Sequence, residues 1–158
     1  MSVIITGGSF VNPEKLVAKL VEAFKGWTEQ DINDDYWREQ FTTPKWKYQY
    51  EEVTRRKNPA ALIKEADSPR DIYDYGDLYE SGVKSYNFSS TNDVASADWK
   101  WDAKNSTGNY YAYYVHEGYG TNATPRKWTE ELYVPAEFDA SDLKRKLLAR
   151  IKTAMGTK

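Results

Sequence analysis

Apolar residues recur at helical spacing near both ends of the chain, and this pattern limits the folds that the sequence can adopt. The stripe toward the N-terminus consists of Leu16, Val17, Leu20, Val21, Phe24 and Trp27. It follows Asn12, a typical helix-capping residue, and Pro13, which suits the first helical position. Gly26 is a helix-stop signal. We therefore predict a helix from about Pro13 to Lys25.

A second apolar stripe, at intervals of four residues, lies near the C-terminus. It is formed by Leu143, Leu147, Ile151 and Met155. We expect Asp139 to open this helix and Gly156 to end it. The helix is rich in Lys and Arg, which suits the negative end of a helix dipole. As a functional alternative, its basic face docks on the acidic segment 28–40 of an adjacent copy.

The sequence between the two stripes alternates as β-strands do. Trp46, Tyr48 and Tyr50 alternate with polar residues, which predicts a strand continuing toward residue 54. Segments 83–88 and 94–101 are predicted to be antiparallel strands, with Trp99 and Trp101 on one face. Segment 28–40 is predicted to be a loop with one helical turn. The order of elements indicates an α+β fold: a small antiparallel sheet with a long aromatic β-meander, packed against an N-terminal and a C-terminal helix.

Length and composition limit the organisation further. A chain of 158 residues is expected to form one domain, 1–158, in which residues 1–11 are a strand or an N-terminal arm. Its 13 Tyr, 6 Trp and 5 Phe predict an aromatic core and aromatic contact surfaces. The formal net charge of -2 lacks the basic footprint of a general nucleic-acid binder. Neither a signal-peptide pattern nor a membrane-length apolar run is found, so we expect a cytoplasmic protein or a particle assembled there.

His116 is the only histidine and the first candidate for catalysis. A nucleophilic triad needs a hydroxyl and an acid bonded to the imidazole, but the sequence does not place Ser81, Ser85 or Asp77 beside it. We interpret His116 as part of a turn at a packed surface, where it can titrate near neutral pH and modulate an interface.

Acidic residues at intervals of three, Asp71, Asp74 and Asp77, suggest a metal site. Their spacing differs from that of a calcium loop, and a helix cap at Asp74 with Asp77 in the first turn explains two of them. The chain has no cysteine, and its glycines lack the spacing of phosphate-binding loops. We therefore predict no catalytic residues, no metal and no cofactor.

Three segments resemble signature stretches of a known family. Residues 74–81 read Asp-Tyr-Gly-Asp-Leu-Tyr-Glu-Ser, residues 111–118 read Tyr-Ala-Tyr-Tyr-Val-His-Glu-Gly, and residues 125–128 read Pro-Arg-Lys-Trp. In order and spacing they are similar to the small neck and tail-completion proteins of tailed bacteriophages, also called minor capsid or minor tail proteins. Tyr75 departs from the family pattern, which has Thr at this position. The resemblance favours a helical turn at 110–117.

The resemblance implies a structural virion protein rather than an enzyme. Such proteins form rings, here expected to be hexameric, in the neck or upper tail, assembled in the host cytoplasm. The implied partners are further copies of the chain, the connector or head-closure protein, and the tail tube or terminator. DNA would pass through the lumen without sequence-specific binding. Whether the chain is a neck protein or a tail terminator stays open.

The predicted interface is aromatic. We expect the meander and the N-terminal segment to supply part of it, and the candidate residues are Trp99, Trp101, Tyr113, His116, Tyr119, Arg126 and Trp128. Two alternatives from other classes remain. One is a carbohydrate- or ligand-binding module that uses the aromatic meander, and the other is a hydrolase built on His116.

Overall fold

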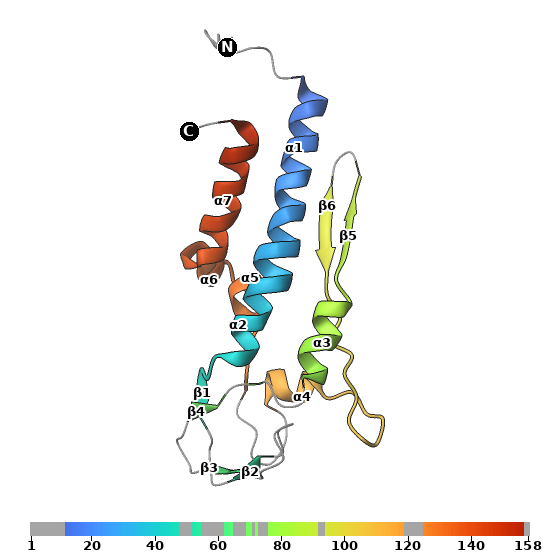
Figure 1. Cartoon of the computed structure of the whole chain (residues 1–158), viewed down its shortest axis with the longest axis vertical. Helices are drawn as coiled ribbons and strands as arrows, with labels where there is room; N and C mark the ends of the chain where they lie inside the picture. Colours follow the sequence, from blue (N-terminus) through green and yellow to red (C-terminus); the bar gives the residue numbers. More distant parts are fainter. Residues whose placement is uncertain are drawn as a thin grey trace.

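Helices make up most of the described residues, and the strands among them form short antiparallel pairs. The computed structural model describes residues 12–47, 52–54, 62–64, 69–70, 72, 76–91, 94–118 and 125–156. Long helices run along the molecule, with a β-hairpin beside them and shorter elements at the other end (Figure 1). The predicted α+β class is confirmed.

The N-terminal helix begins as the sequence predicts but does not stop at the predicted residue. In α1 (Pro13–Gly26), the Asn12 side chain accepts a 2.9 Å hydrogen bond from the backbone N–H of Glu14. Gly26 has ordinary helical dihedrals, φ -59° and ψ -36°. The chain therefore continues into a π-helix, η1 (Trp27–Tyr36), and then into α2 (Trp37–Thr42). The predicted loop over 28–40 is wrong.

The π-helical turns explain why this acidic segment is helical. Its buried residues come in adjacent pairs, namely Trp27 with Thr28, Ile32 with Asn33, Tyr36 with Trp37, and Gln40 with Phe41. The pairs are separated by five and then four residues, because a π-helix bonds residue i to i+5 and so has wider turns. Glu29, Asp34 and Asp35 lie between the pairs and are exposed, whereas Asp31 is partly buried.

The C-terminal helix packs antiparallel to α1, so both described ends of the chain lie at the same end of the molecule (Figure 1). The predicted start at Asp139 is wrong: α6 (Pro135–Ala140) ends there, and α7 (Asp142–Met155) begins after Ser141. The Ser141 hydroxyl accepts a hydrogen bond from the Lys144 N–H at 3.3 Å. The predicted end is confirmed, since Gly156 adopts a left-handed φ of 72°.

In the part of the chain that the structure describes, three pairs of strands stand in place of the continuous sheet that was expected. β1 (Trp46–Lys47) pairs with β4 (Pro69–Arg70), β2 (Glu52–Thr54) with β3 (Leu62–Lys64), and β5 (Asn87–Ser90) with β6 (Ala95–Asp98), all antiparallel. The predicted strand at 83–88 begins too early, because Val83 belongs to α3 (Asp77–Lys84). Residues 48–51 of the predicted 46–54 strand lie outside the described residues.

The start of α3 differs from the predicted cap. Gly76, with a left-handed φ of 90°, occupies the cap position, and Asp77 lies in the first turn as expected. Asp71 and Asp74 lie outside the described residues. The remaining helices are α4 (Ala112–Glu117) and α5 (Glu130–Tyr133), of which α4 confirms the predicted helical turn at 110–117.

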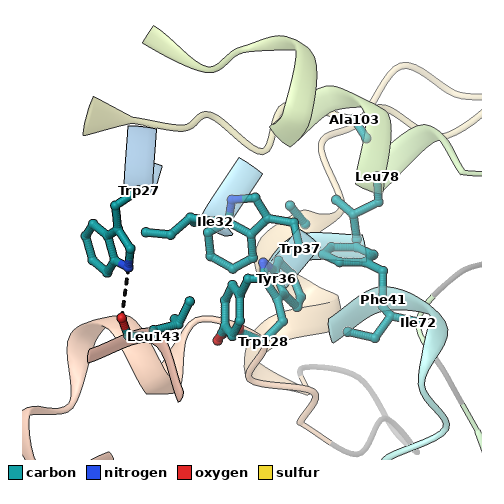
Figure 2. Close-up of a cluster of buried hydrophobic side chains, with 11 residues drawn as sticks. Trp27, Ile32, Tyr36, Trp37, Phe41, Ile72, Leu78, Ala103, Trp128 and Leu143 are labelled. Atoms are coloured by element: carbon teal, nitrogen blue, oxygen red, sulfur yellow. Dashed lines mark hydrogen bonds between the residues drawn. The ribbon is translucent and has the colours of Figure 1, made fainter. Parts of the chain in front are cut away.

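The core is aromatic, as predicted, and it gathers around η1 and α2 (Figure 2). Its buried members are Trp27, Ile32, Tyr36, Trp37, Phe41, Ile72, Leu78, Ala103, Ala112, Trp128 and Leu143. The indole N–H of Trp27 donates a 2.9 Å hydrogen bond to the Leu143 carbonyl, which joins η1 to α7 (Figure 2). The core thus connects both ends of the sequence.

Candidate interaction surfaces

The tryptophans of the predicted interface pack against the core. The rings of Trp99 and Trp101 lie 5.7 and 5.1 Å from that of Trp37, at interplanar angles of 78° and 85°. The predicted strand 94–101 ends at Asp98, so both indoles belong to the loop that follows β6 (Ala95–Asp98). Trp101 also stacks on Phe41 at 5.3 Å, and Trp128 is only 2% exposed. Trp99 and Trp101 are partly buried against the core, and their contact with another subunit stays a prediction.

The same packing bears on the ligand-binding alternative. The Trp99 indole N–H donates a 3.0 Å hydrogen bond to the Asn33 side chain, and its ring also lies 5.4 Å from Tyr86. A ring that stacks on a sugar needs one open face. Trp99 and Trp101, both partly buried, contribute to the contacts of the loop after β6 with η1 and α2.

Exposed tyrosines surround α4 at the opposite end of the molecule from the chain ends (Figure 1). Tyr110, Tyr113 and Tyr114 are 57%, 61% and 55% exposed, and the rings of the last two lie 6.1 Å apart. We call these three residues the tyrosine patch. Of the predicted interface residues, Tyr113 thus lies on the surface, whereas Tyr119 lies outside the described residues.

His116 holds α4 to the segment that follows it. Its Nδ1 lies 2.7 Å from the Glu117 carboxylate and its Nε2 lies 2.8 Å from the Thr129 hydroxyl. Its ring meets Trp128 edge-on, with centroids 4.7 Å apart. The Arg126 N–H donates to the His116 carbonyl at 3.1 Å. Since both ring nitrogens are engaged, this arrangement positions backbone segments.

Ser81 and Ser85, which were considered as nucleophiles, form hydrogen bonds with backbone groups. The Ser81 hydroxyl donates to the Leu78 carbonyl at 2.8 Å. The Ser85 hydroxyl accepts from the Lys100 N–H at 2.6 Å, which joins α3 to the end of the hairpin. Neither serine is a hydrogen-bond partner of His116. The hydroxyl that does reach the imidazole, Thr129, carries no sequence signal that would have singled it out.

Further exposed apolar side chains lie on α1 and α7. We define the helical patch as Val17 and Leu20 of α1 with Leu148 and Met155 of α7, which are 43%, 37%, 48% and 41% exposed. A separate groove of about 720 Å³ between the two helices is lined by four alanines, five charged residues and Thr153, and by none of these four side chains. Sequence analysis placed Val17, Leu20 and Met155 in apolar stripes and missed their exposure, and it did not single out Leu148.

The acidic segment and the basic helix do meet, but within one chain. The Arg150 Nε lies 2.5 Å from the Asp31 carboxylate, and its Nη2 donates to the Gln30 side chain at 2.9 Å. Arg150 thus makes an internal contact between α7 and η1, and docking of the basic face on an adjacent copy stays a prediction. The internal contact forms because η1 is helical and lies directly beside α7.

Comparison with known proteins leaves these surfaces as the main guide to function. No family model, no curated protein and no solved structure matches the chain. In the part of the chain that the structure describes, no group of His, Asp or Glu side chains is arranged to hold a metal ion. The helices of that part include none with the length and apolar character needed to cross a membrane.

Proposed function

We propose that the chain is a structural subunit of a tailed-bacteriophage virion, forming a hexameric ring in the neck or upper tail. The ring joins the head connector to the tail tube or terminator and keeps the DNA channel continuous. The proposal rests on the three family-like segments in order and on one structural observation, the presence of two different exposed apolar surfaces.

The two surfaces belong to different elements. The helical patch lies on α1 and α7, and the tyrosine patch surrounds α4 at the other end (Figure 1). Exposed apolar side chains that gather in one place are typical of protein-protein contacts, and Tyr is enriched in them. A closed ring of identical subunits needs two unlike, complementary surfaces on each copy. Two separate patches supply what such a ring requires.

The charge of the chain also suits this role. A conduit that bound phosphates tightly would slow the passage of DNA, since each phosphate contact adds affinity. A formal net charge of -2 avoids such binding. In this proposal Trp99 and Trp101 support the core, and the contacts between subunits come from the two patches.

Mixing two complementary variants tests the ring. Leu20→Glu places a charge in the helical patch, and Tyr113→Ser with Tyr114→Ser removes two rings from the tyrosine patch. We expect the unmodified chain to form a closed oligomer by native mass spectrometry, and each variant alone to be monomeric. Their mixture should form a dimer, because each variant keeps the surface that the other has lost. Ser106→Glu, in an exposed turn, is the control and should leave the oligomer unchanged.

Two results would contradict the proposal. The first is an unmodified chain that stays monomeric at high concentration. The second is absence of the chain from purified phage particles produced from the genome that encodes it. Particle images with a labelled subunit locate it, and a label outside the neck and upper tail would also contradict the assignment.

A further inference from the structure

The hairpin of β5 and β6 has one edge against the rest of the molecule and one open edge. β6 is the strand next to α1, and β5 lies on the far side (Figure 1). Asn87, Ser89 and Ser90 of β5 are exposed. Among the strands that the structure describes, only β6 pairs with β5. In this part of the chain β5 is therefore an edge strand.

The register of the hairpin shows which backbone groups of β5 face outward. The Thr91 N–H donates a 2.7 Å hydrogen bond to the Val94 carbonyl, so these two residues form a hydrogen-bonded pair. Bonded and non-bonded pairs alternate along an antiparallel ladder. Ser90 therefore belongs to a non-bonded pair, Ser89 to a bonded one and Phe88 to a non-bonded one. The backbone N–H and C=O groups of Phe88 and Ser90 consequently point away from β6.

This edge lacks features with which proteins protect their edge strands. Charged side chains, Pro and β-bulges normally keep other strands from pairing there. β5 reads Asn-Phe-Ser-Ser, without charge or Pro, and its register with β6 runs through consecutive residues without a bulge. The outward backbone groups of Phe88 and Ser90 are therefore available to a further strand.

The sequence supplies a segment that suits this edge. Residues 1–11 precede α1, lie outside the described residues and carry no charged side chain. They include a run of β-branched residues, the type most enriched in strands, namely Val3, Ile4, Ile5 and Thr6. Segment 7–12 links this run to α1 and spans up to about 20 Å when extended. That length is enough for the run to reach beyond its own helix.

The edge is open to a strand from outside the chain. In the single chain Asn87, Ser89 and Ser90 of β5 are exposed. Copies of the same chain are the nearest partners in the proposed ring, and each copy brings its own segment 3–6. Because neither β5 nor residues 1–11 carry a charged side chain, no like charges oppose their approach.

We propose that segment 3–6 of one copy pairs with the β5 edge of the next copy and adds a third strand to its hairpin. This contact rests on the proposed function, and it adds to the contacts of the helical and tyrosine patches. An extended segment and an open strand edge are unlike and complementary surfaces, as a closed ring requires. Backbone hydrogen bonds give such strand addition its affinity.

Hydrogen–deuterium exchange of the full chain, resolved to single residues, tests the pairing. In the oligomer, the amides of Phe88 and Ser90 should exchange at least about tenfold more slowly than in the dilute monomer, because they become hydrogen-bonded. The Thr91 amide is bonded within the hairpin and serves as the internal reference. Equal exchange of Phe88 and Ser90 in oligomer and monomer overturns the proposal. If both are slow in the monomer, the strand comes from the same chain and the assignment to the next copy is wrong.

A double variant removes the strand that is added. Ile4→Pro with Ile5→Pro eliminates two adjacent N–H groups, one of which faces β5 in any register. It should weaken association about tenfold or more and abolish the protection of Phe88 and Ser90. Ile4→Val with Ile5→Val keeps the N–H groups and the branched side chains, so this control should behave as the unmodified chain. Unchanged association and protection in the proline variant overturn the proposal.

A second variant alters the accepting edge. Ser90→Pro removes an outward N–H that the hairpin ladder does not use, and Pro is tolerated at such edge positions. It should weaken association as the donor variant does, whereas Ser90→Ala keeps the N–H and should have no effect. Melting curves show whether each variant folds, and the Ile4 and Ile5 variant decides the question if Ser90→Pro unfolds the hairpin.

The outcomes for strand pairing and for the proposed ring are distinguishable. A closed oligomer in which Phe88 and Ser90 exchange fast keeps the ring and overturns only the strand pairing. An oligomer that is not closed but protects both amides supports the pairing and contradicts the ring. A chain that stays monomeric at high concentration contradicts both.

Discussion

Trp101 covers Gly82 so closely that no side chain fits at this position of α3. A Cβ built on Gly82 would lie 2.0 Å from Cζ3 of Trp101 and 2.3 Å from Cε3. The same indole stacks on Phe41 and meets Trp128 at 5.6 Å. Because Gly82 has no side chain, the Trp101 ring fits against α3, and the loop after β6 can reach the core.

Gly82→Ala should destabilise the protein, although alanine is the better helix former. Helix propensity alone would favour Ala by about 1 kcal/mol. The clash with the Trp101 ring has no flexible side-chain end to move aside, and overpacking of this kind costs about 1–3 kcal/mol. We expect the clash to dominate, giving a lower free energy of unfolding in urea denaturation.

A double-mutant cycle controls for other effects of the added methyl group. In a Trp101→Ala background, the ring that clashes is gone, so Gly82→Ala should become neutral or stabilising. An equal cost of Gly82→Ala in both backgrounds would show that the close contact is not the cause.

Trp27 and Trp37 offer a comparison of two buried indoles. The Trp27 N–H donates to the Leu143 carbonyl at 2.9 Å, whereas the Trp37 N–H is buried without an acceptor in the described part of the chain. Replacement by Phe removes similar volume from both sites. Trp27→Phe should cost about 1 kcal/mol more than Trp37→Phe in free energy of unfolding, because only the former breaks a hydrogen bond. Equal costs in chemical denaturation would contradict this interpretation.

The sequence was sufficient for the elements with standard periodicity. The cap at Asn12, the helix end at Gly156 and the turn at α4 were all predicted, since each depends on local chemistry or on the family-like segment. The packing of Trp99 and Trp101 against the core was not predicted, because it depends on Trp37, which sequence analysis had assigned to a loop.

The π-helical segment shows why the rest could not be predicted. Starting from Trp27, a period of 3.6 residues leads to Asp31, Asp34 or Asp35, and Arg38, all polar. The apolar face becomes visible only with the wider turns of η1. The burial of Asn33 and Gln40 was missed for the same reason, because both are buried only when η1 and α2 are helical.

The contact between Arg150 and Asp31 should stabilise the protein more than an exposed ion pair does. Its side chains are 30% and 13% exposed, and Arg150 also reaches Gln30. Asp31→Asn should lower the free energy of unfolding by about 1–2 kcal/mol, since it weakens a partly buried charge-assisted hydrogen bond. A cycle with Arg150→Gln isolates the pair.

The matched control is the pair Asp35 and Arg38, three residues apart on the same helical run and 56% and 62% exposed. Asp35→Asn should change stability by less than about 0.5 kcal/mol, because solvent and salt screen exposed pairs. The stabilising role of the Arg150 contact is wrong if Asp31→Asn and Asp35→Asn lower the free energy of unfolding equally. It is also wrong if Asp31→Asn changes only the oligomeric state.

Tyr36 should make the protein sensitive to alkali. Burial and neighbouring carboxylates raise the pKa of its hydroxyl in the folded state, while in the unfolded chain it is near the ordinary tyrosine value of about 10. The stabilising effect of this shift is complete below pH 10 and is lost as the pH rises further, because the unfolded state then releases a proton that the folded state keeps. The loss amounts to about 1.4 kcal/mol per pH unit for one such group.

Tyr36→Phe removes that titration together with the hydrogen bond to the Trp128 carbonyl. The variant should be about 1 kcal/mol less stable at neutral pH, and the gap between it and the unmodified chain should narrow above pH 10. Urea denaturation from pH 7 to 11 measures both effects. Tyr133→Phe, at a 73% exposed position, is the control and should leave a constant gap. Parallel stability curves for Tyr36→Phe and the unmodified chain above pH 10 would mean that Tyr36 ionises equally in the folded and unfolded states.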